Sequence, residues 1–390
     1  MSNISGGRGT YVIFGDLVGL DEARFARMLE RRGLRHEEKD APWATLVWVT
    51  FEASGKYDKR AFRMRSRAKN VLDASGHEII TNKRALHLAM RANARMRDIY
   101  ARHFARTWGL REFAVGADDL VARDRVFIAR PSTVGFASGR GITRITARAD
   151  VDAAVARYKR MGQRVADGVI VSEYLSDPYL FYPPEGGAGL KFHLRMYMLF
   201  RACDGESTPR AGGGVFWELF GSSDDDARAP RAKILTAREP YERARYDRDE
   251  IHDTHAGSTA GAWFFPTHAS AIRSPDGRAL DVAEIWSQMA RICGALAELM
   301  RHGGARPYPE SEVAFEVFGL DVMVVRRRIE GSRADPCAVL LEVNDRVGYA
   351  TPRGALFDRF QDDYFEWVWA RGIEPCLRGG GTSRLAESDE

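Results

Sequence analysis

Apolar residues along the first fifty positions follow two different periods. Short apolar runs at 10–15 (TYVIFG) and 44–51 (ATLVWVTF) are typical of buried β-strands, and between them a helical pattern spans about 21–32. A strand, a helix and a second strand in this order predict a β-α-β unit at the start of the chain.

Helical periodicity recurs four times in the rest of the sequence. The longest pattern occupies 82–104, and Thr81 directly before it is the expected N-cap. Further helices are predicted over 150–162, 280–302 and 354–371.

Strand-like segments dominate the second half of the chain. Short apolar or alternating runs bounded by Gly, Pro or charged residues predict strands at 126–132, 169–175, 191–200, 214–221, 313–325 and 338–344, and a Gly-rich turn at 135–145 runs into another strand. Strands outnumber helices in the second half of the chain, which favours an α+β fold of sheets with flanking helices. The Gly-rich and acidic end of the chain, 376–390, is expected to be disordered.

Composition narrows the class of protein. The 390 residues are 45% apolar and 29% charged, which is ordinary for a globular protein of two or three domains or lobes. No apolar run approaches the ~18 residues of a membrane span, and the N-terminus has no secretory pattern. The four cysteines are far apart and lack zinc spacing. Reduced thiols in a cytoplasmic protein are the simplest interpretation.

Charge is distributed unevenly. Residues 56–106 contain 14 Lys and Arg against four Asp and Glu, a net charge of +10, whereas the whole chain is +4. A basic segment can attract a polyanion, such as an acidic peptide or a nucleic acid, or it can simply form a solvated helix face. No nucleic-acid-binding motif accompanies it, so a nucleic-acid partner would rest on charge alone.

Two stretches suit an anionic ligand. In KFHLRMYMLF the polar residues Lys191, His193 and Arg195 alternate with apolar ones, so they share one face of a strand. The other stretch, 126–142, ends a strand at Arg130 and continues into a Gly-rich loop. Such a loop can let backbone N–H groups approach a phosphate, although a plain turn is the commoner explanation.

Three oxygen-bearing residues suit a magnesium ion. Asp321 lies inside an apolar strand, where a lone carboxylate is costly unless it is paired or binds a metal. Glu342 and Asn344 are two residues apart and so share a face of the next strand. If the intervening segment is a hairpin, the three side chains converge, and carboxylate and amide oxygens are ligands that Mg²⁺ accepts.

Taken together and in this order, the motifs resemble the tubulin–tyrosine ligase-like family, a branch of the ATP-grasp ligases. The matching pieces run from about residue 70 to 345, with a fainter match before that, and end in the most specific pair, FEVFGLD followed by LLEVN. The others are YVIFGD near the start, GHEIITNK, FIARPS with GRGI, VIVSEYLSDP, KFHLRMYML and REPY. The resemblance implies an ATP-grasp fold, in which two α+β lobes built on antiparallel sheets hold ATP and a small N-terminal α/β domain precedes them. The corresponding division is 1–75, 76–175 with the phosphate loop, 176–375 with the magnesium site, and the tail 376–390.

The resemblance also implies roles for individual residues. Asp321, Glu342 and Asn344 would hold Mg²⁺, while Lys191 and Arg195 would act with Glu342 at the transferred phosphoryl group. The remaining implied residues contact ATP. Arg130 stands at the position of the family's phosphate-binding lysine, and Lys83 matches a basic residue of the small N-terminal portion. The flexible phosphate loop would be Gly139, Arg140, Gly141 and Ile142, and the hinge that meets adenine would be Ser172, Glu173, Tyr174 and Leu175.

The implied activity is ATP-dependent amide-bond formation through an acyl phosphate, between a carboxylate of an acidic protein tail, such as that of tubulin, and a free Glu, Gly or Tyr. We expect a monomer in the cytoplasm, in contact with the cytoskeleton if tubulin is the acceptor, and no membrane partner. Two other readings are an ATP-grasp ligase of small molecules and a non-catalytic module that binds tubulin or another polyanion.

The sequence departs from the family pattern at a few positions near the site. Arg130 stands in place of a lysine, His193 in place of an aspartate, and IHDTHA at 251–256 in place of H-L-T-N. Asp345–Gly348 also differs from the family's usual continuation. We expect these positions to bear on which amino acid is added.

Overall fold

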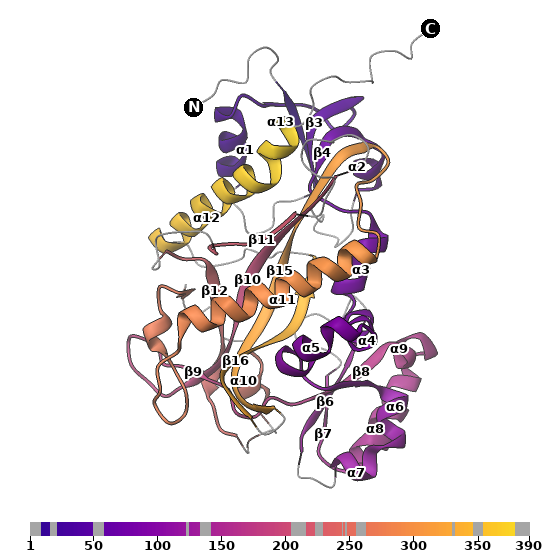
Figure 1. Ribbon diagram of the computed structural model, residues 1–390, viewed down its shortest axis with the longest axis vertical. Helices are drawn as coiled ribbons and strands as arrows, with labels where there is room; N and C mark the ends of the chain where they lie inside the picture. The colour runs from indigo at the N-terminus through magenta and orange to yellow at the C-terminus, as the bar shows by residue number, and fades with distance from the viewer. Residues whose placement is uncertain are drawn as a thin grey trace.

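The computed structural model describes residues 9–15, 22–49, 58–121, 125–132, 142–203, 216–222, 229–243, 245, 248–254, 263–329, 332–345 and 354–378. These residues form two sheets with helices packed around them (Figure 1). The predicted α+β class is confirmed, and the arrangement is ATP-grasp-like. Within the described residues, no helix combines the length and apolar character needed to cross a membrane.

The larger sheet has twelve described strands, and its main path runs β13-β12-β10-β15-β4-β3-β1-β2. Its strands are β1 (Thr10–Phe14), β2 (Arg35–His36), β3 (Trp43–Val49), β4 (Arg65–Lys69), β9 (Leu180–Phe181), β10 (Leu190–Cys203), β11 (Phe216–Leu219), β12 (Ala232–Pro240), β13 (Phe264–Phe265), β14 (Ile272–Arg273), β15 (Ser311–Ile329) and β16 (Ser332–Asn344). The first four strands are parallel to their neighbours, whereas β10, β12, β15 and β16 are antiparallel.

The smaller sheet is antiparallel, in the order β5-β8-β6-β7. Its strands are β5 (Thr107–Gly109), β6 (Phe127–Pro131), β7 (Thr143–Ile145) and β8 (Val169–Glu173). One face is covered by α6 (Leu110–Val115), α7 (Ala117–Val121), α8 (Arg148–Arg160) and α9 (Gln163–Gly168), which share a separate apolar core with it. Its other face, which carries Arg130, turns toward the strands of the larger sheet (Figure 1).

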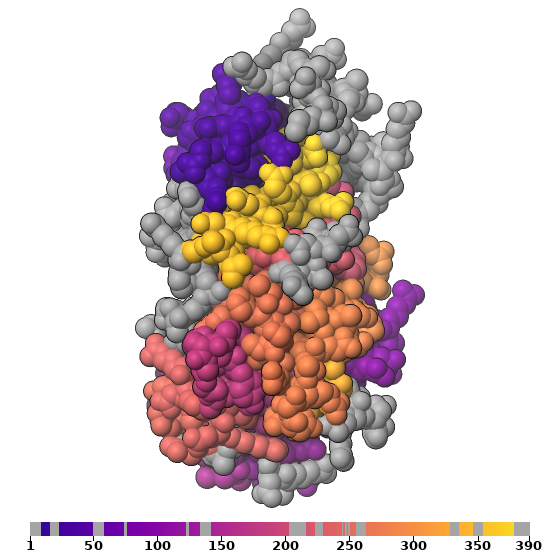
Figure 2. All heavy atoms as spheres, turned by 90° about the vertical axis from the view of Figure 1, so that its left-hand side faces the viewer, coloured from indigo at the N-terminus to yellow at the C-terminus, as the bar shows by residue number. Residues whose placement is uncertain are grey.

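The longest helix, α11 (Val282–His302), covers one face of the larger sheet and buries its apolar stripe against alternate residues of β10 and β15. On the opposite face, α1 (Glu22–Arg31) and α12 (Ala355–Trp367) form a second core over the N-terminal strands. Figure 2 shows α12 and the following helices, η3 (Val368–Ile373) and α13 (Glu374–Arg378), lying against this N-terminal part. Surface ion pairs link the two, for example Arg24 with Asp358 at 2.9 Å.

The predicted helix over 82–104 is interrupted. The structure has α4 (Lys83–Ala92), a short turn η1 (Ala94–Met96) and α5 (Arg97–His103). Asn93 ends α4 in an extended conformation and caps the next turn by accepting from Arg95 N. The predicted cap, Thr81, is also wrong: Asn82 is the N-cap and accepts from the amides of Arg84 and Ala85, because an Asn side chain satisfies free N–H groups of the first turn well.

The remaining elements connect these layers. They are α2 (Lys59–Arg63), α3 (Ala74–Thr81), α10 (Asp249–His252) and η2 (Ala269–Ala271). One strand pair joins two of the predicted domains. β4 of the N-terminal part pairs with the start of β15, so the N-terminal strands continue the larger sheet. In addition, α13 extends to Arg378, so residues 376–378 of the expected tail are helical. The predicted boundaries at 75, 175 and 375 stay predictions.

Candidate active site

The strand β10 separates apolar and polar side chains between its two faces. Phe192, Leu194 and Met196 join the core under α11, as the period of two predicts. Lys191, His193 and Arg195 point to the opposite face, where they are buried or largely buried. Arg195 lies opposite Asp321 of β15 and contacts both of its oxygens, through Nε and through Nη2 at 2.9 Å.

A β-bulge brings the second carboxylate to the same place. Asp321 pairs with Glu342 but Val322 pairs with Leu340, so Leu341 is an extra residue in β16. Leu340 lies in the core under α11, whereas Glu342, two residues later, lies beside Asp321 on the other face. The Asn344 amide then donates to Asp321 Oδ2 at 3.2 Å. The predicted convergence of the three residues is present in the structure.

Cations from two other parts of the chain complete the cluster. Lys83, the first residue of α4, lies 2.9 Å from Glu342 Oε2. Arg130, on β6 of the smaller sheet, lies 3.9 Å from the same oxygen and donates to the bulged carbonyl of Leu341 at 2.9 Å. The cluster therefore lies between the two sheets, and Arg130 joins them.

The charges around the two carboxylates set their ionisation. Burial raises the pKa of Asp321, but Arg195 and His193 outweigh burial and hold it well below its ordinary value. Burial also raises the pKa of Glu342, and Lys83 with Arg130 again brings it below its ordinary value. Both groups are thus carboxylates near neutral pH, as metal ligands must be.

Lys191 has a different environment. Its ammonium is 3% exposed, donates to the Tyr174 hydroxyl at 2.7 Å and lies 4.1 Å from the centre of that ring. Burial lowers the pKa of Lys191 to about 7. A buried amine of this kind gains a strong partner when an anion arrives beside it.

The predicted hinge lies where the chain passes from the smaller to the larger sheet. Ser172 and Glu173 end β8, and the Ser172 hydroxyl lies 2.9 Å from that of Thr107. Tyr174 joins Lys191 to His252, whose Nδ1 lies 2.7 Å from the tyrosine hydroxyl. Leu175 packs on an apolar cluster of β15 and β16.

The phosphate loop is only partly visible. Gly139, Arg140 and Gly141 lie outside the described residues, and Ile142, just before β7, is 44% exposed. The predicted phosphate loop therefore stays a prediction.

Sequence reasoning did not assign a role to Thr254, which contacts the site. Its hydroxyl lies 2.6 Å from His193 Nδ1, and His193 Nε2 lies 3.5 Å from Asp321 Oδ1. His193, which differs from the family pattern, is thus in contact with the IHDTHA segment through Thr254, a residue that matches the pattern. The departures at His193 and at Asp253, next to Thr254, were the signal that could have paired the two segments.

The donor set fits magnesium better than a transition metal. Within the described ranges, no three His, Cys, Asp or Glu side chains are arranged to hold a metal ion by themselves. Two carboxylates and an amide are a smaller set of hard oxygen and amide ligands. Mg²⁺ accepts such a set because it usually takes several ligands from water and phosphate oxygens.

Residues 62–205 match the family model described as Tubulin-tyrosine ligase family. This range contains Lys83, Arg130, Lys191 and Arg195, and it ends before the strands of the carboxylates. No curated protein sequence matches the chain. Over these residues, the match supports the tubulin-tyrosine ligase-like assignment that the motifs predicted.

Proposed function

We propose that this tubulin-tyrosine ligase-like protein is an ATP-dependent ligase that joins a protein carboxylate to the amino group of a free amino acid. The family implies ATP-dependent ligation in general. The observation that carries the proposal for this chain is the pair of opposed carboxylates, Asp321 and Glu342, surrounded by cations from β10, α4 and β6. Two carboxylates that face each other on neighbouring strands repel each other. A purely structural ion pair would need only one of them.

The residues divide into two groups. Asp321, Glu342 and Asn344 would hold Mg²⁺, which supplies electrostatic stabilisation of phosphate oxygens. Lys83, Arg130, Lys191 and Arg195 would bind the phosphates of ATP and spread the charge that develops during transfer. Ser172–Leu175 would border the base.

The reaction needs no nucleophilic side chain. A carboxylate oxygen of the acceptor attacks the γ-phosphorus, the bond from that phosphorus to ADP breaks, and an acyl phosphate forms. The amine of the amino acid then attacks the acyl carbon, phosphate leaves, and the nitrogen loses a proton to give the amide. Lys191, whose pKa burial lowers to about 7 in the protein without ligand, would take up a proton when phosphate binds and so present its full charge to the transferred group.

The acceptor we propose is an acidic protein tail in the cytoplasm, with tubulin as the first to test. The net charge of +10 over 56–106 supports an acidic acceptor, because a small-molecule substrate needs no extended basic approach. Glu, Gly and Tyr are the amino acids to compare, and polyglutamylation is the reaction to test first.

The experiment incubates the protein with Mg-ATP, tubulin or a glutamate-rich peptide, and radiolabelled Glu, Gly or Tyr. We expect ATP-dependent incorporation of one of them by the wild type and none by Glu342→Gln. Incorporation that survives Glu342→Gln would remove the carboxylate from its proposed role. Peptide binding without incorporation of any amino acid would instead indicate a non-catalytic module.

A further inference from the structure

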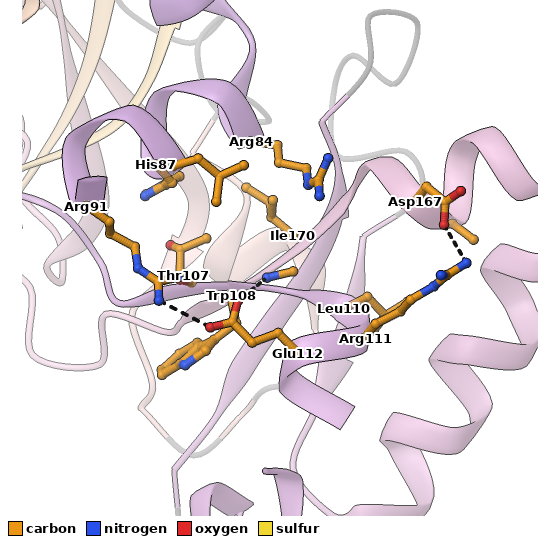
Figure 3. Close-up of a pocket in the computed structure, with 13 residues that line it drawn as sticks. Arg84, His87, Arg91, Thr107, Trp108, Leu110, Arg111, Glu112, Asp167 and Ile170 are labelled. Atoms are coloured by element: carbon orange, nitrogen blue, oxygen red, sulfur yellow. Dashed lines mark hydrogen bonds and ion pairs between the residues drawn. The ribbon is translucent and has the colours of Figure 1, made fainter. Parts of the chain in front are cut away.

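A cavity of about 390 Å³ lies beside α4, between this helix and part of the smaller sheet with its helices α6 and α9 (Figure 3). Its walls are α4, the edge strand β5, the start of α6 and the end of α9 with β8. Arg84, His87, Leu88 and Arg91 of α4 face it, since residues three and four apart share one side of a helix. None of these four residues belongs to the cluster of Asp321 and Glu342.

Three arginines line this cavity, Arg84, Arg91 and Arg111, and they differ in whether they form an ion pair. Arg91 pairs with Glu112 at 3.2 Å, and Arg111 pairs with Asp167 at 2.7 Å. Arg84 is exposed and forms no ion pair with any residue that the structure describes. The cavity therefore has an excess positive charge at Arg84. Arg111 and Asp167 are mostly exposed, so their pair is weak and Arg111 can exchange it for a ligand carboxylate.

The cavity also has an apolar part. Leu88 is 48% exposed at its wall, and the half-buried Trp108, whose ring packs against Phe113 and Phe127, also belongs to the lining. His87 also lines the cavity and is uncharged near neutral pH, because burial, together with the charges of Arg130 and Arg91, lowers its pKa to about 3. An occupant that suits this lining carries carboxylates together with one apolar side chain.

The edge of the small sheet is already protected. β5 is the outermost strand, and its outward carbonyl at Thr107 accepts from Arg91 at 3.3 Å. The outward amide at Gly109 donates to Glu112 at 3.3 Å. The Arg91–Glu112 pair thus occupies the positions that an added strand would need. A ligand is therefore recognised by its side chains rather than by extending the sheet.

From this geometry we propose that the cavity is a docking site for an acidic peptide segment, with a carboxylate at Arg84 and an apolar side chain at Leu88. The purpose of the site rests on the proposed function, since the segment would belong to the acceptor protein. α4 connects the two places, because Lys83 at its start contacts Glu342.

Binding can be measured without catalysis. The probe is a fluorescein-labelled glutamate-rich peptide with one central Phe, and the comparison peptide has Ser in that place. We expect Arg84→Glu to weaken binding of the Phe peptide about tenfold, equivalent to about 1.4 kcal/mol, and Leu88→Asp to remove the preference for Phe over Ser. Arg35→Glu is the matched control, because Arg35 is an exposed arginine on β2 in the N-terminal part.

Three results would overturn the proposal: unchanged binding by both cavity variants, an equal loss in Arg35→Glu, or equal binding of a single-stranded oligonucleotide of the same charge. Binding of an ATP analogue by each variant, unchanged from wild type, shows that the fold is intact. Loss of peptide binding in Arg84→Glu supports the docking site even if no amino acid is ever incorporated. Incorporation with unaltered peptide binding would reject the docking site and leave the ligase standing.

Discussion

Asp321 and Glu342 lie directly opposite each other on antiparallel strands, and each carboxylate is matched by its own cation, Arg195 or Lys83. Two opposed carboxylates normally destabilise a strand pair. Their retention in a buried place is explained if they bind a cation in the working protein.

The first prediction concerns that cation. Glu342→Gln should weaken binding of a non-hydrolysable ATP analogue with Mg²⁺ by at least about tenfold, because one of two anionic ligands is lost. Titration calorimetry gives the affinity, and EDTA should lower the wild-type affinity in the same way. Glu366→Gln is the control, since Glu366 forms an exposed pair with Arg32. Equal affinities for Glu342→Gln and wild type would contradict the assignment.

The second prediction concerns the proton on Lys191. With a pKa of about 7, this amine is largely neutral at about pH 8 in the protein without ligand. Phosphates bound beside it favour the charged form, so binding of an ATP analogue at that pH should take up close to one proton. Calorimetry in two buffers with different heats of ionisation measures the uptake. Lys191→Met should abolish it, and the same uptake in this variant would show that another group titrates.

The third prediction is that the contribution of His77 to stability falls as pH rises from neutral. His77 lies 3.9 Å from Glu316 and 3.7 Å from Asp345, and although burial lowers its pKa, these carboxylates outweigh burial and raise it to about 9. A raised pKa stabilises the folded state fully below the ordinary value of 6.5, and this contribution is lost as pH passes 9.

The free energy of unfolding that His77→Gln removes, measured by urea unfolding, should therefore be smaller at about pH 9.5 than at about pH 7 by on the order of 1–3 kcal/mol. His302→Gln, at an exposed histidine of α11, should show no such difference between the two pH values. A pH dependence that is the same in His77→Gln and wild type would rule out the charged histidine as its source.

The fourth prediction concerns close packing at α3. A Cβ at Gly76 would lie 2.1 Å from Ala305 Cα, so the backbone of the segment after α11 would have to move. Gly76→Ala should cost roughly 1–3 kcal/mol in the free energy of unfolding. Gly109→Ala is the control, because a Cβ there meets nothing within 4 Å. A cost below that of Gly109→Ala would show that the segment yields easily.

The period of two in β10 was enough to predict that Lys191, His193 and Arg195 share one face of the strand. The other face carries only apolar side chains at these positions, because it packs on the core under α11. The same rule predicted correctly that Glu342 and Asn344 share a face. It could not predict the bulge at Leu341, without which Glu342 would follow Leu340 into the core. A bulge is selected by contacts across the site, here the hydrogen bond from Arg130, and not by the local sequence.

Other features depended on competition between neighbours in the sequence. Thr81 and Asn82 are both capping residues, and the stronger cap, Asn82, begins α4. In the sequence, Asn93 is compatible with an exposed position of a continuous helix. In the structure it ends α4 and caps the turn η1. The contact of Thr254 with His193 joins residues 61 positions apart, and no periodicity encodes such a distance.

The chain enters the smaller sheet after Phe104 and leaves it through Tyr174, and β15 fastens all other sheet strands of the site into one continuous body. Tyr174, at the second of these crossings, contacts Lys191. Arg130 of the smaller sheet donates to the Leu341 carbonyl of β16, so the two sheets are also joined through the site itself. An anion that draws Lys191 away from Tyr174 would therefore change a contact at a place where the two sheets meet.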